Sequence, residues 1–289
     1  MLRRILDSYR FRIAHRFRQQ RVQRFRPLVL QLPWPPIKDV PTAPFTLLMF
    51  AGRGQIELVK VSLSSILQTW SVVPPLRLVS DGSMNADELR AQVPAWPVDI
   101  TAITWTVAAD TAPPAVRRLA EVNVLGRKLA AILDSAKRSP TLFVDSDVLW
   151  FRGPPPIPST ATACKLSTDV QASFDHDLLR HVGLASLPPM NTGVCFAAGD
   201  LYAAAGLEDA THYAAERPTY FSEQTILAVA AQRLGGQHYS SDEVVLRTDD
   251  GLIPDGDTRY MQTSYARHYV GDVRHWMWRD ALRLLNVKR

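Results

Sequence analysis

The sequence predicts an α/β fold in which a mixed, mainly parallel sheet is flanked by helices. Between residues 45 and 145, apolar runs of strand length alternate with segments of helical periodicity, separated by glycine or proline. This alternation is typical of βαβ units. The chain has 289 residues, of which 46% are hydrophobic and 21% charged, so it can bury a large core. We expect one α/β domain over residues 45–289, preceded by an arm and a linker over residues 1–44.

The first half of this domain repeats the order strand, loop, helix. A continuous apolar run over 45–50 predicts the first strand, which ends in the loop at Ala51 before a helix over 56–67. A strand over 76–79, a polar helix and a strand near 98–104 follow. Helical spacing over 115–138 predicts a long helix, and its expected inner side comprises Leu119, Val122, Leu125, Leu129 and Leu133. That helix leads into a strand that ends at Asp145.

The second half of the domain has a different pattern. A strand is expected from Asn191 to Phe196, a helix over 222–234 and a short strand over 265–270. In open α/β sheets, ligands bind outside the carboxyl ends of the strands. We therefore expect the second half to lie along that edge and to form the acceptor side of a cleft.

The net charge of +5 is concentrated in a basic N-terminal arm. Residues 1–26 contain nine arginines and one acid, so they carry +8 and leave −3 for the rest of the chain. An amphipathic stripe recurs there at helical steps, formed by Leu2, Ile5, Leu6, Tyr9, Ile13 and Phe17. Such a helix suits an anionic membrane surface, and it equally suits docking on the body or on another subunit. Nucleic acid binding is not expected, because the body lacks basic patches interleaved with aromatic residues.

The cellular compartment is indicated by features that the sequence lacks. Cys164 and Cys195 form no Cys-x-x-Cys pair, so we expect two small buried residues in a reducing compartment. No apolar stretch approaches the roughly 18 residues that span a bilayer, and the N-terminus lacks the apolar core of a secretory signal. We expect a cytoplasmic protein, with peripheral attachment to the inner face of the membrane as the alternative if the arm binds lipid.

A pair of carboxylates, Asp145 and Asp147, follows the apolar run 141–144 at a predicted strand end. Hard divalent cations such as Mn²⁺ or Mg²⁺ prefer oxygen ligands and leave room for substrate phosphates. The spacing therefore indicates a metal site for phosphate chemistry. By itself it is equally typical of a strand end stopped by two solvated acids.

Three later segments favour the metal interpretation. His268 can complete a metal site, Gly271 lets the backbone approach a phosphate, and Arg274 can neutralise a diphosphate. A second segment, from Asn191 to Gly193, offers an amide at a strand entry, where it could bond to sugar hydroxyls. A third segment opens a helix with Glu223 and Gln224, although Ser222 before them also suits an N-cap.

Taken in order, these segments resemble the nucleotide-sugar transferases of glycosyltransferase family 8, which have the GT-A fold. The resemblance extends from about residue 45 to residue 276. It implies that Asp145, Asp147 and His268 bind Mn²⁺ (or Mg²⁺) against the diphosphate of a nucleotide-sugar donor. It further implies donor contacts by the residues that match the family's other motifs, namely Ala51, Lys128, Asn191, Gly193, Gly271 and Arg274. Glu223 and Gln224 match the family's helix start near the donor sugar and are the candidate catalytic residues.

The chain departs from the family pattern at four positions. Arg274 and His275 stand where the family has lysine and proline, Glu223 replaces aspartate, and Thr225 replaces a carboxylate. The first change keeps the charge but alters its geometry, and the last two leave the identity of the sugar open. What the resemblance implies is a retaining, metal-dependent hexosyltransferase with a UDP-sugar donor and a glycan or lipid-linked acceptor.

Two other functions remain open from the sequence. A GT-A-like domain could bind a nucleotide-sugar or a partner without catalysis. A haloacid-dehalogenase-type phosphatase also places Asp-x-Asp after a strand, but it needs Thr or Val where this chain has Leu149, and it has the motif early in the domain. The acidic loop with Asp249, Asp250, Asp255 and Asp257 lacks the terminal Glu of an EF-hand, so we expect it to be solvated and free of metal.

Overall fold

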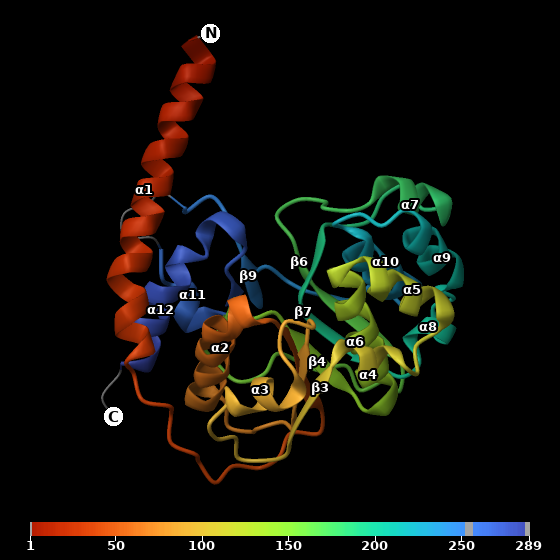
Figure 1. Ribbon diagram of the computed structural model, residues 1–289, viewed down its shortest axis with the longest axis horizontal. Coiled ribbons are helices and arrows are strands. Elements are labelled where there is room, and N and C mark those ends of the chain that lie inside the picture. The colour runs from red at the N-terminus through yellow and green to blue at the C-terminus, as the bar shows by residue number, and fades with distance from the viewer. Residues whose placement is uncertain (1, 252–256, 287–289) are drawn as a thin grey trace.

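The computed structural model describes the backbone of residues 2–251 and 257–286, and the side chains of residues 14–251 and 257–286. In this part of the chain a seven-stranded sheet has the order β3-β2-β1-β4-β7-β6-β8 (Figure 1). Its strands are β1 (Thr46–Ala51), β2 (Leu76–Ser80), β3 (Ile100–Thr104), β4 (Thr141–Val144), β6 (Ala163–Thr168), β7 (Met190–Ala198) and β8 (His238–Tyr239). Strands β1 to β4 are parallel, whereas β7 runs antiparallel to both β4 and β6. The predicted mixed, mainly parallel sheet is confirmed.

Side chains of β1 alternate between two apolar layers. Leu48 and Phe50 pack with Leu129 in one cluster, whereas Leu47 and Met49 pack with the opposite layer. This alternation is the period of two that a strand buried on both faces requires.

The helices that follow the arm are α2 (Ile56–Thr69), α3 (Ala86–Ala91), α4 (Trp105–Ala109), α5 (Pro114–Val122), α6 (Val124–Arg138), α7 (His176–His181), α8 (Leu201–Ala204), α9 (Glu208–Glu216), α10 (Ser222–Arg233), α11 (Tyr260–Thr263) and α12 (His275–Leu285).

The prediction of one long helix over 115–138 is wrong in one respect, because the segment forms two helices, α5 and α6. Asn123 adopts an extended backbone (φ −140°, ψ 125°) between α5 and α6. Its side chain accepts a hydrogen bond from the backbone N–H of Leu125 at 2.8 Å, so it caps α6. Val122 is therefore 59% exposed and does not belong to the inner side that the helical spacing predicted.

A second, three-stranded sheet has the order β5-β10-β9 and consists of β5 (Val148–Trp150), β10 (Ala266–His268) and β9 (Val244–Leu246). Strand β10 pairs antiparallel with β5 and parallel with β9. Only three residues separate the end of β4 from the start of β5, so the Asp145–Asp147 turn connects the two sheets. This small sheet brings the C-terminal part of the chain to the end of β4.

The arm forms the long helix α1 (Leu2–Leu30), which lies alongside α12 and extends past the rest of the molecule at its amino end (Figure 1). Val29, Phe25 and Val22 join an apolar cluster that also contains Trp276 and Met277. The structure thus shows that the second half of the arm docks on the body of the protein. The side chains of Leu2, Ile5, Leu6, Tyr9 and Ile13 lie outside the described residues. Within the described residues, each helix is too short or too polar to cross a bilayer.

Candidate active site

Strand register brings the three expected metal ligands together. Val148 pairs with His268 across β5 and β10, and the backbone N–H of Tyr269 donates to the carbonyl oxygen of Asp147 at 2.8 Å. On the other side of the turn, the backbone N–H of Asp145 donates to the carbonyl oxygen of Gly193 in β7 at 2.8 Å. The two acids are therefore fixed between two sheets, beside a histidine 121 residues further along the chain.

The side chains of this triad have the geometry and chemistry of a metal site. One ligand atom from each of Asp145, Asp147 and His268 lies within 4.8 Å of the others. His268 directs Nε2 to Asp147 Oδ1 at 3.2 Å and to Asp145 Oδ2 at 3.7 Å, while its buried Nδ1 has no hydrogen-bond partner. Two carboxylates and an imidazole nitrogen suit Mn²⁺. The residues therefore fit the expected divalent ion.

Gly193 makes room for the His268 ring. A Cβ at this position would lie 2.1 Å from His268 Cε1 and 2.3 Å from Nδ1. Any side chain there would displace the ring from the carboxylates. Gly193 itself is buried and does not line the cleft, so the structure places it behind His268, one of the expected metal ligands.

Arg274 lies on the open side of the triad. Its Nε and Nη2 donate to Asp147 Oδ2 at 2.9 and 2.6 Å, and its side chain is 49% exposed. Gly271 has φ +48°, a left-handed conformation that L side chains rarely adopt, and it lines the same cleft. The cation and the glycine that the sequence placed near the expected metal ligands thus both lie in the cleft beside the triad.

The charges in the triad depend on one another. Burial alone would raise the pKa of Asp147, but His268 and Arg274 hold it well below its usual range. Burial alone would lower the pKa of His268, but the Asp147 and Asp145 carboxylates raise it above its ordinary value. Opposite charges a few ångströms apart in a buried setting produce both shifts.

Lys128 joins the triad to the helix start at Glu223. It is buried, and its Nζ lies 3.1 Å from Asp145 Oδ1 and 3.6 Å from Glu223 Oε1. It also donates to Thr192 Oγ1 at 3.1 Å, and Thr192 donates to Glu223 Oε2 at 3.2 Å. Burial opposes the charge on Lys128, but the two carboxylates raise its pKa; burial raises the pKa of Glu223 above its ordinary value despite Lys128.

Asn191 and Gln224 form the far side of the same arrangement. Asn191 Nδ2 donates to Gln224 Oε1 at 3.4 Å and to Asp169 Oδ2 at 3.3 Å, while its Oδ1 accepts from the backbone N–H of Gly193 at 2.8 Å. Gln224 Nε2 donates to the carbonyl oxygen of Ser173 at 2.8 Å. These hydrogen bonds fix the orientation of both side-chain amides. Glu223 and Lys128 line the same cleft.

These residues line one cleft of about 380 Å³. Of the residues expected from the sequence it contains Lys128, Asp145, Asp147, Asn191, Glu223, Gln224, His268, Gly271 and Arg274. Ala51 is fully buried and does not line it; Phe50, Gln55 and Asp81 do so at that end. Sequence reasoning also missed Asp169, Gln171, Ser173, Tyr220 and Phe221 on the opposite side. Only the exposed aromatic pair Tyr220-Phe221, beside the predicted helix start, carried a local signal.

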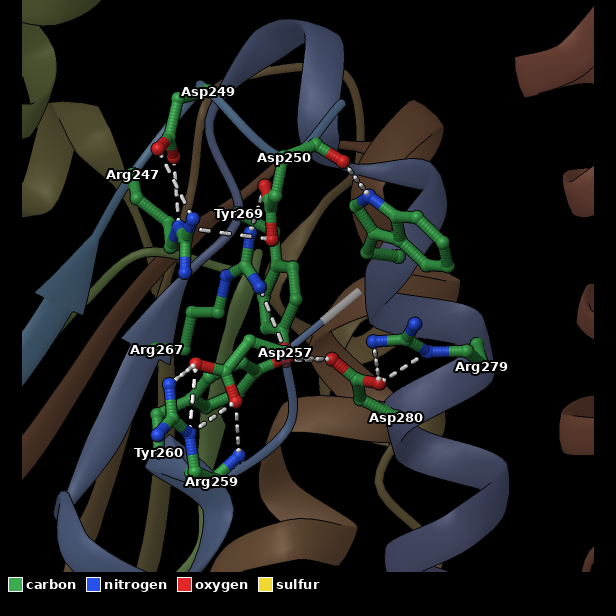
Figure 2. A network of polar contacts seen from close by, with 11 residues as sticks. Arg247, Asp249, Asp250, Asp257, Arg259, Tyr260, Arg267, Tyr269, Arg279 and Asp280 are labelled. Atoms are coloured by element: carbon green, nitrogen blue, oxygen red, sulfur yellow. Dashed lines mark hydrogen bonds and ion pairs between the residues drawn. The ribbon is translucent and has the colours of Figure 1, made fainter. Parts of the chain in front are cut away.

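A buried charge network surrounds Arg267 of β10 (Figure 2). Arg267 precedes His268, and successive residues of a strand point to opposite faces. Arg267 donates to Asp250 Oδ1 at 2.8 Å and to the Tyr260 hydroxyl at 2.9 Å. Tyr260 and Tyr269 both donate to Asp280 in α12. Asp250 is fully buried, so the expectation of a solvated acidic loop is wrong at this residue, because Arg267 compensates its charge. Asp255 lies outside the described residues.

Comparisons with known proteins connect this geometry to one group of folds. No protein-family model matches the sequence, and no curated protein matches it either. Among solved structures, the galactosyltransferase LgtC, in complex with donor and acceptor sugar analogues, is similar with a TM-score of 0.53 at 15% identity, over 84% of this chain and 95% of its own. Mouse xyloside xylosyltransferase 1 gives a TM-score of 0.53 at 14% identity, over 79% and 98%. The bifunctional glycosyltransferase WbbM gives 0.52 at 10% identity, over 88% of this chain and 51% of its own. At these identities the likeness shows the fold, and the expected GT-A glycosyltransferase fold is confirmed.

Proposed function

We propose that this protein is a metal-dependent, retaining glycosyltransferase that uses a nucleoside-diphosphate sugar, with UDP as the expected nucleotide. The observation that carries the proposal is the triad of Asp145, Asp147 and His268 on the wall of a cleft that also contains Arg274 and Lys128. Asp147 is buried and Asp145 partly buried, so they can hold a divalent cation, and this cation together with Lys128 and Arg274 suits a diphosphate. The similarity to glycosyltransferase folds supports the same reading of the cleft.

The triad and Arg274 would act on the leaving group. When bound, Mn²⁺ or Mg²⁺ would supply Lewis-acid stabilisation of the departing diphosphate. Arg274 can exchange its contact with Asp147 for the diphosphate oxygens, because its guanidinium is half exposed and presents several donors. Gly271 lines the same cleft, so the backbone there can approach a diphosphate without a side chain in the way. Preorganised donors of this kind stabilise charge as it develops.

On the sugar side, Glu223, Gln224 and Asn191 would orient hydroxyl groups. Glu223 is held by Lys128 and Thr192, and Gln224 by Ser173 and Asn191, so neither side chain is poised as a free nucleophile. We therefore favour transfer on one face of the sugar. The bond from the anomeric carbon to the diphosphate oxygen breaks, the acceptor oxygen forms its bond on the same face, and a donor phosphate oxygen takes the acceptor proton.

The experiment that tests this function measures sugar transfer and donor hydrolysis by purified protein with Mn²⁺ and a panel of nucleotide-sugars. Asp147→Ala and His268→Ala should abolish metal-dependent turnover, and Arg274→Ala should lower it about 10²- to 10³-fold. Asp87→Ala, at an exposed position of α3, is the matched control and should retain full turnover. Undiminished turnover in the triad variants would refute the assignment.

The same experiment separates the two alternatives. A non-catalytic domain would bind a nucleotide with Mn²⁺ in calorimetry but release no sugar. A phosphatase would release phosphate from a simple monoester and would not need the nucleotide. A glycan or lipid-linked sugar is the acceptor class we propose, and an acceptor panel with a radiolabelled donor identifies it.

For the basic arm, we propose attachment to an anionic membrane surface on the cytoplasmic side. Arg16 and Arg24 are exposed on the docked half of α1, and the helix continues towards the N-terminus beyond the body (Figure 1). Clustered basic residues near a membrane contribute about 1 kcal/mol each to binding anionic lipid. The full chain should sediment with vesicles containing phosphatidylserine, and Arg16→Gln with Arg24→Gln should weaken this. Equal sedimentation with neutral vesicles would rule the idea out.

A further inference from the structure

The docked half of α1 contacts the segment 271–276, which also contains the cleft residues Gly271 and Arg274. We infer that Arg18 and Arg21 of the arm are positioning residues for this segment, and that they act through it on the diphosphate end of the cleft. The inference rests on the proposed function, because it assigns the arm a role in donor binding. The 3-10 turn η2 (Gly271–Val273) and the first turn of α12 make up the segment.

The first contact is a two-pronged ion pair. Arg18 Nη1 and Nη2 donate to Asp272 Oδ1 and Oδ2 at 2.6 and 2.8 Å. Asp272 lies between Gly271 and Arg274, so Arg18 binds the turn at its middle residue. Two parallel hydrogen bonds fix direction as well as distance. The arm therefore sets where this turn lies relative to α1.

The second contact is a stack on Trp276. The guanidinium carbon of Arg21 lies 3.7 Å from the centroid of this ring, and that of Arg279 lies 3.8 Å from it. Trp276 is fully buried, and its indole N–H donates to the carbonyl oxygen of Asp250 at 2.9 Å. Phe17 adds an edge-on contact with the ring of His275 at 6.2 Å. The arm thus also contacts the two residues that follow Arg274.

Arg274 lies between these two contacts. Its side chain makes the bidentate contact with Asp147 Oδ2, while its own backbone N–H donates only to the carbonyl oxygen of Gly271, at 3.2 Å. A single 3-10 turn has little internal hydrogen bonding to fix its orientation. Contacts from outside the turn must therefore hold it. Arg18 binds the turn directly at Asp272, and Arg21 holds Trp276 in the helix that follows. A small displacement of a positioned group costs more in binding and turnover than in folding.

The arm also supplies a matched control. Arg26 forms an equally short bidentate pair at 2.7 and 2.6 Å, and its partner is Glu57 of α2 rather than a residue of the segment 271–276. Arg18→Ala and Arg26→Ala both remove one such pair between α1 and the body. If the arm only adds stability, the two variants will behave alike. If the arm positions the segment, the two variants will differ in their affinity for the donor nucleotide.

The experiment measures Mn²⁺-dependent binding of UDP by calorimetry and the kinetics of donor turnover in the full chain. Arg18→Ala should weaken UDP binding and raise the donor KM by about two- to fivefold, the range of one partly exposed ion pair. The acceptor KM should not change. Arg26→Ala should keep wild-type donor values while lowering the melting temperature to a similar extent. The charge swap Arg18→Asp with Asp272→Arg should recover part of the lost donor affinity.

Hydrogen exchange of the backbone gives a readout that is independent of activity. Faster exchange at 271–276 is expected in Arg18→Ala and not in Arg26→Ala. Equal donor values and equal exchange in the two variants would overturn the positioning role while the proposed function stands. If the wild type neither binds nucleotide with Mn²⁺ nor turns over donor, the proposed function fails and the inference falls with it; the exchange data then report only the contact.

Discussion

At the scale of single residues, the candidate metal site depends on a position that carries no side chain. Gly193 belongs to β7, and its missing Cβ leaves the space in which the His268 ring stands. The histidine has little freedom to move elsewhere, because it is buried beside both carboxylates. Gly193 thereby sets the position of a candidate ligand without itself lining the cleft, as residues behind the ligands do in known metal sites.

We predict that Gly193→Ala weakens Mn²⁺ binding by about 10- to 100-fold, because the new methyl group displaces His268 from its ligand position. Calorimetric titration of the purified variant with Mn²⁺ measures this. Gly54→Ala is the control, since a Cβ there meets nothing within 4 Å. Wild-type Mn²⁺ affinity in Gly193→Ala would show that the ring does not have to stay where the structure places it.

The residues of the site differ in how well the sequence reveals them. The position of Asp145 and Asp147 can be predicted from their neighbours in the sequence, because an apolar run that ends in paired acids marks a strand end. His268 lies 121 residues from Asp147, and only a family resemblance connected the two before the strand register did. The bridging of Asp145 and Glu223 by Lys128 has no local signature at all. Asp169 was missed because nothing in its neighbourhood indicates that the fold carries it to Asn191.

At the scale of elements, the end of β10 and the residue after it show how three successive residues can serve two environments. His268 points into the cleft, while Arg267 and Tyr269 point to the opposite face and enter the network with Asp250 and Asp280 (Figure 2). Successive residues of a strand face opposite ways, so the register that places the ligand also places the network. The buried Arg267–Asp250 pair anchors the strand to the chain that follows β9.

We predict that Asp250→Ala lowers the free energy of unfolding by about 3–5 kcal/mol, because it leaves the fully buried Arg267 guanidinium without its carboxylate. Denaturant unfolding followed by circular dichroism measures the loss. Asp249→Ala removes a neighbouring pair with Arg247 that is largely exposed on the Asp249 side, so it should cost at most about 1 kcal/mol. Similar losses in the two variants would contradict the burial argument.

The elements also show what periodicity can and cannot predict. Strands β1 and β4 were predicted because each is an apolar run buried on both faces, and β2 because three apolar residues stand in a short segment that ends in a glycine turn. The break between α5 and α6 was not, since apolar spacing continues through Asn123 and only its capping hydrogen bond interrupts the helix. Strand β5 has three residues, too few to show a period, and it exists through its pairing with β10.

At the scale of the whole molecule, α1 closes a third apolar cluster that separate parts of the chain build together. Val29 of the arm, Leu58 of α2 and Trp276 of α12 belong to it, so the arm is packed against the body in a way that charge counting could not predict. The net charge of the arm indicated an anionic partner, yet Arg18 and Arg26 find carboxylates of the same chain. His275 lies at this junction, with Arg18 and Arg21 nearby.

This junction should make stability depend on pH. Burial, together with the charges of Arg21 and Arg18, lowers the pKa of His275 from 6.5 to about 4, although its hydrogen bond to the Asp272 carbonyl oxygen opposes the shift. The unfolded chain therefore binds a proton at His275 that the folded chain does not. The contribution of neutral His275 to the free energy of unfolding is fully present above the pKa that this residue has in the unfolded chain. It is lost progressively as the pH falls from about 6.5 towards about 4.

We predict that the loss of unfolding free energy between about pH 7.5 and about pH 5 is smaller in His275→Gln than in the wild type, because glutamine takes up no proton on unfolding. Denaturant unfolding at the two pH values measures both losses, and the carboxylates common to the two proteins cancel in the difference. His238→Gln, at an exposed position of β8, is the control and should follow the wild type. If His275→Gln loses as much stability as the wild type on acidification, the α1–α12 junction is not the source of the pH dependence.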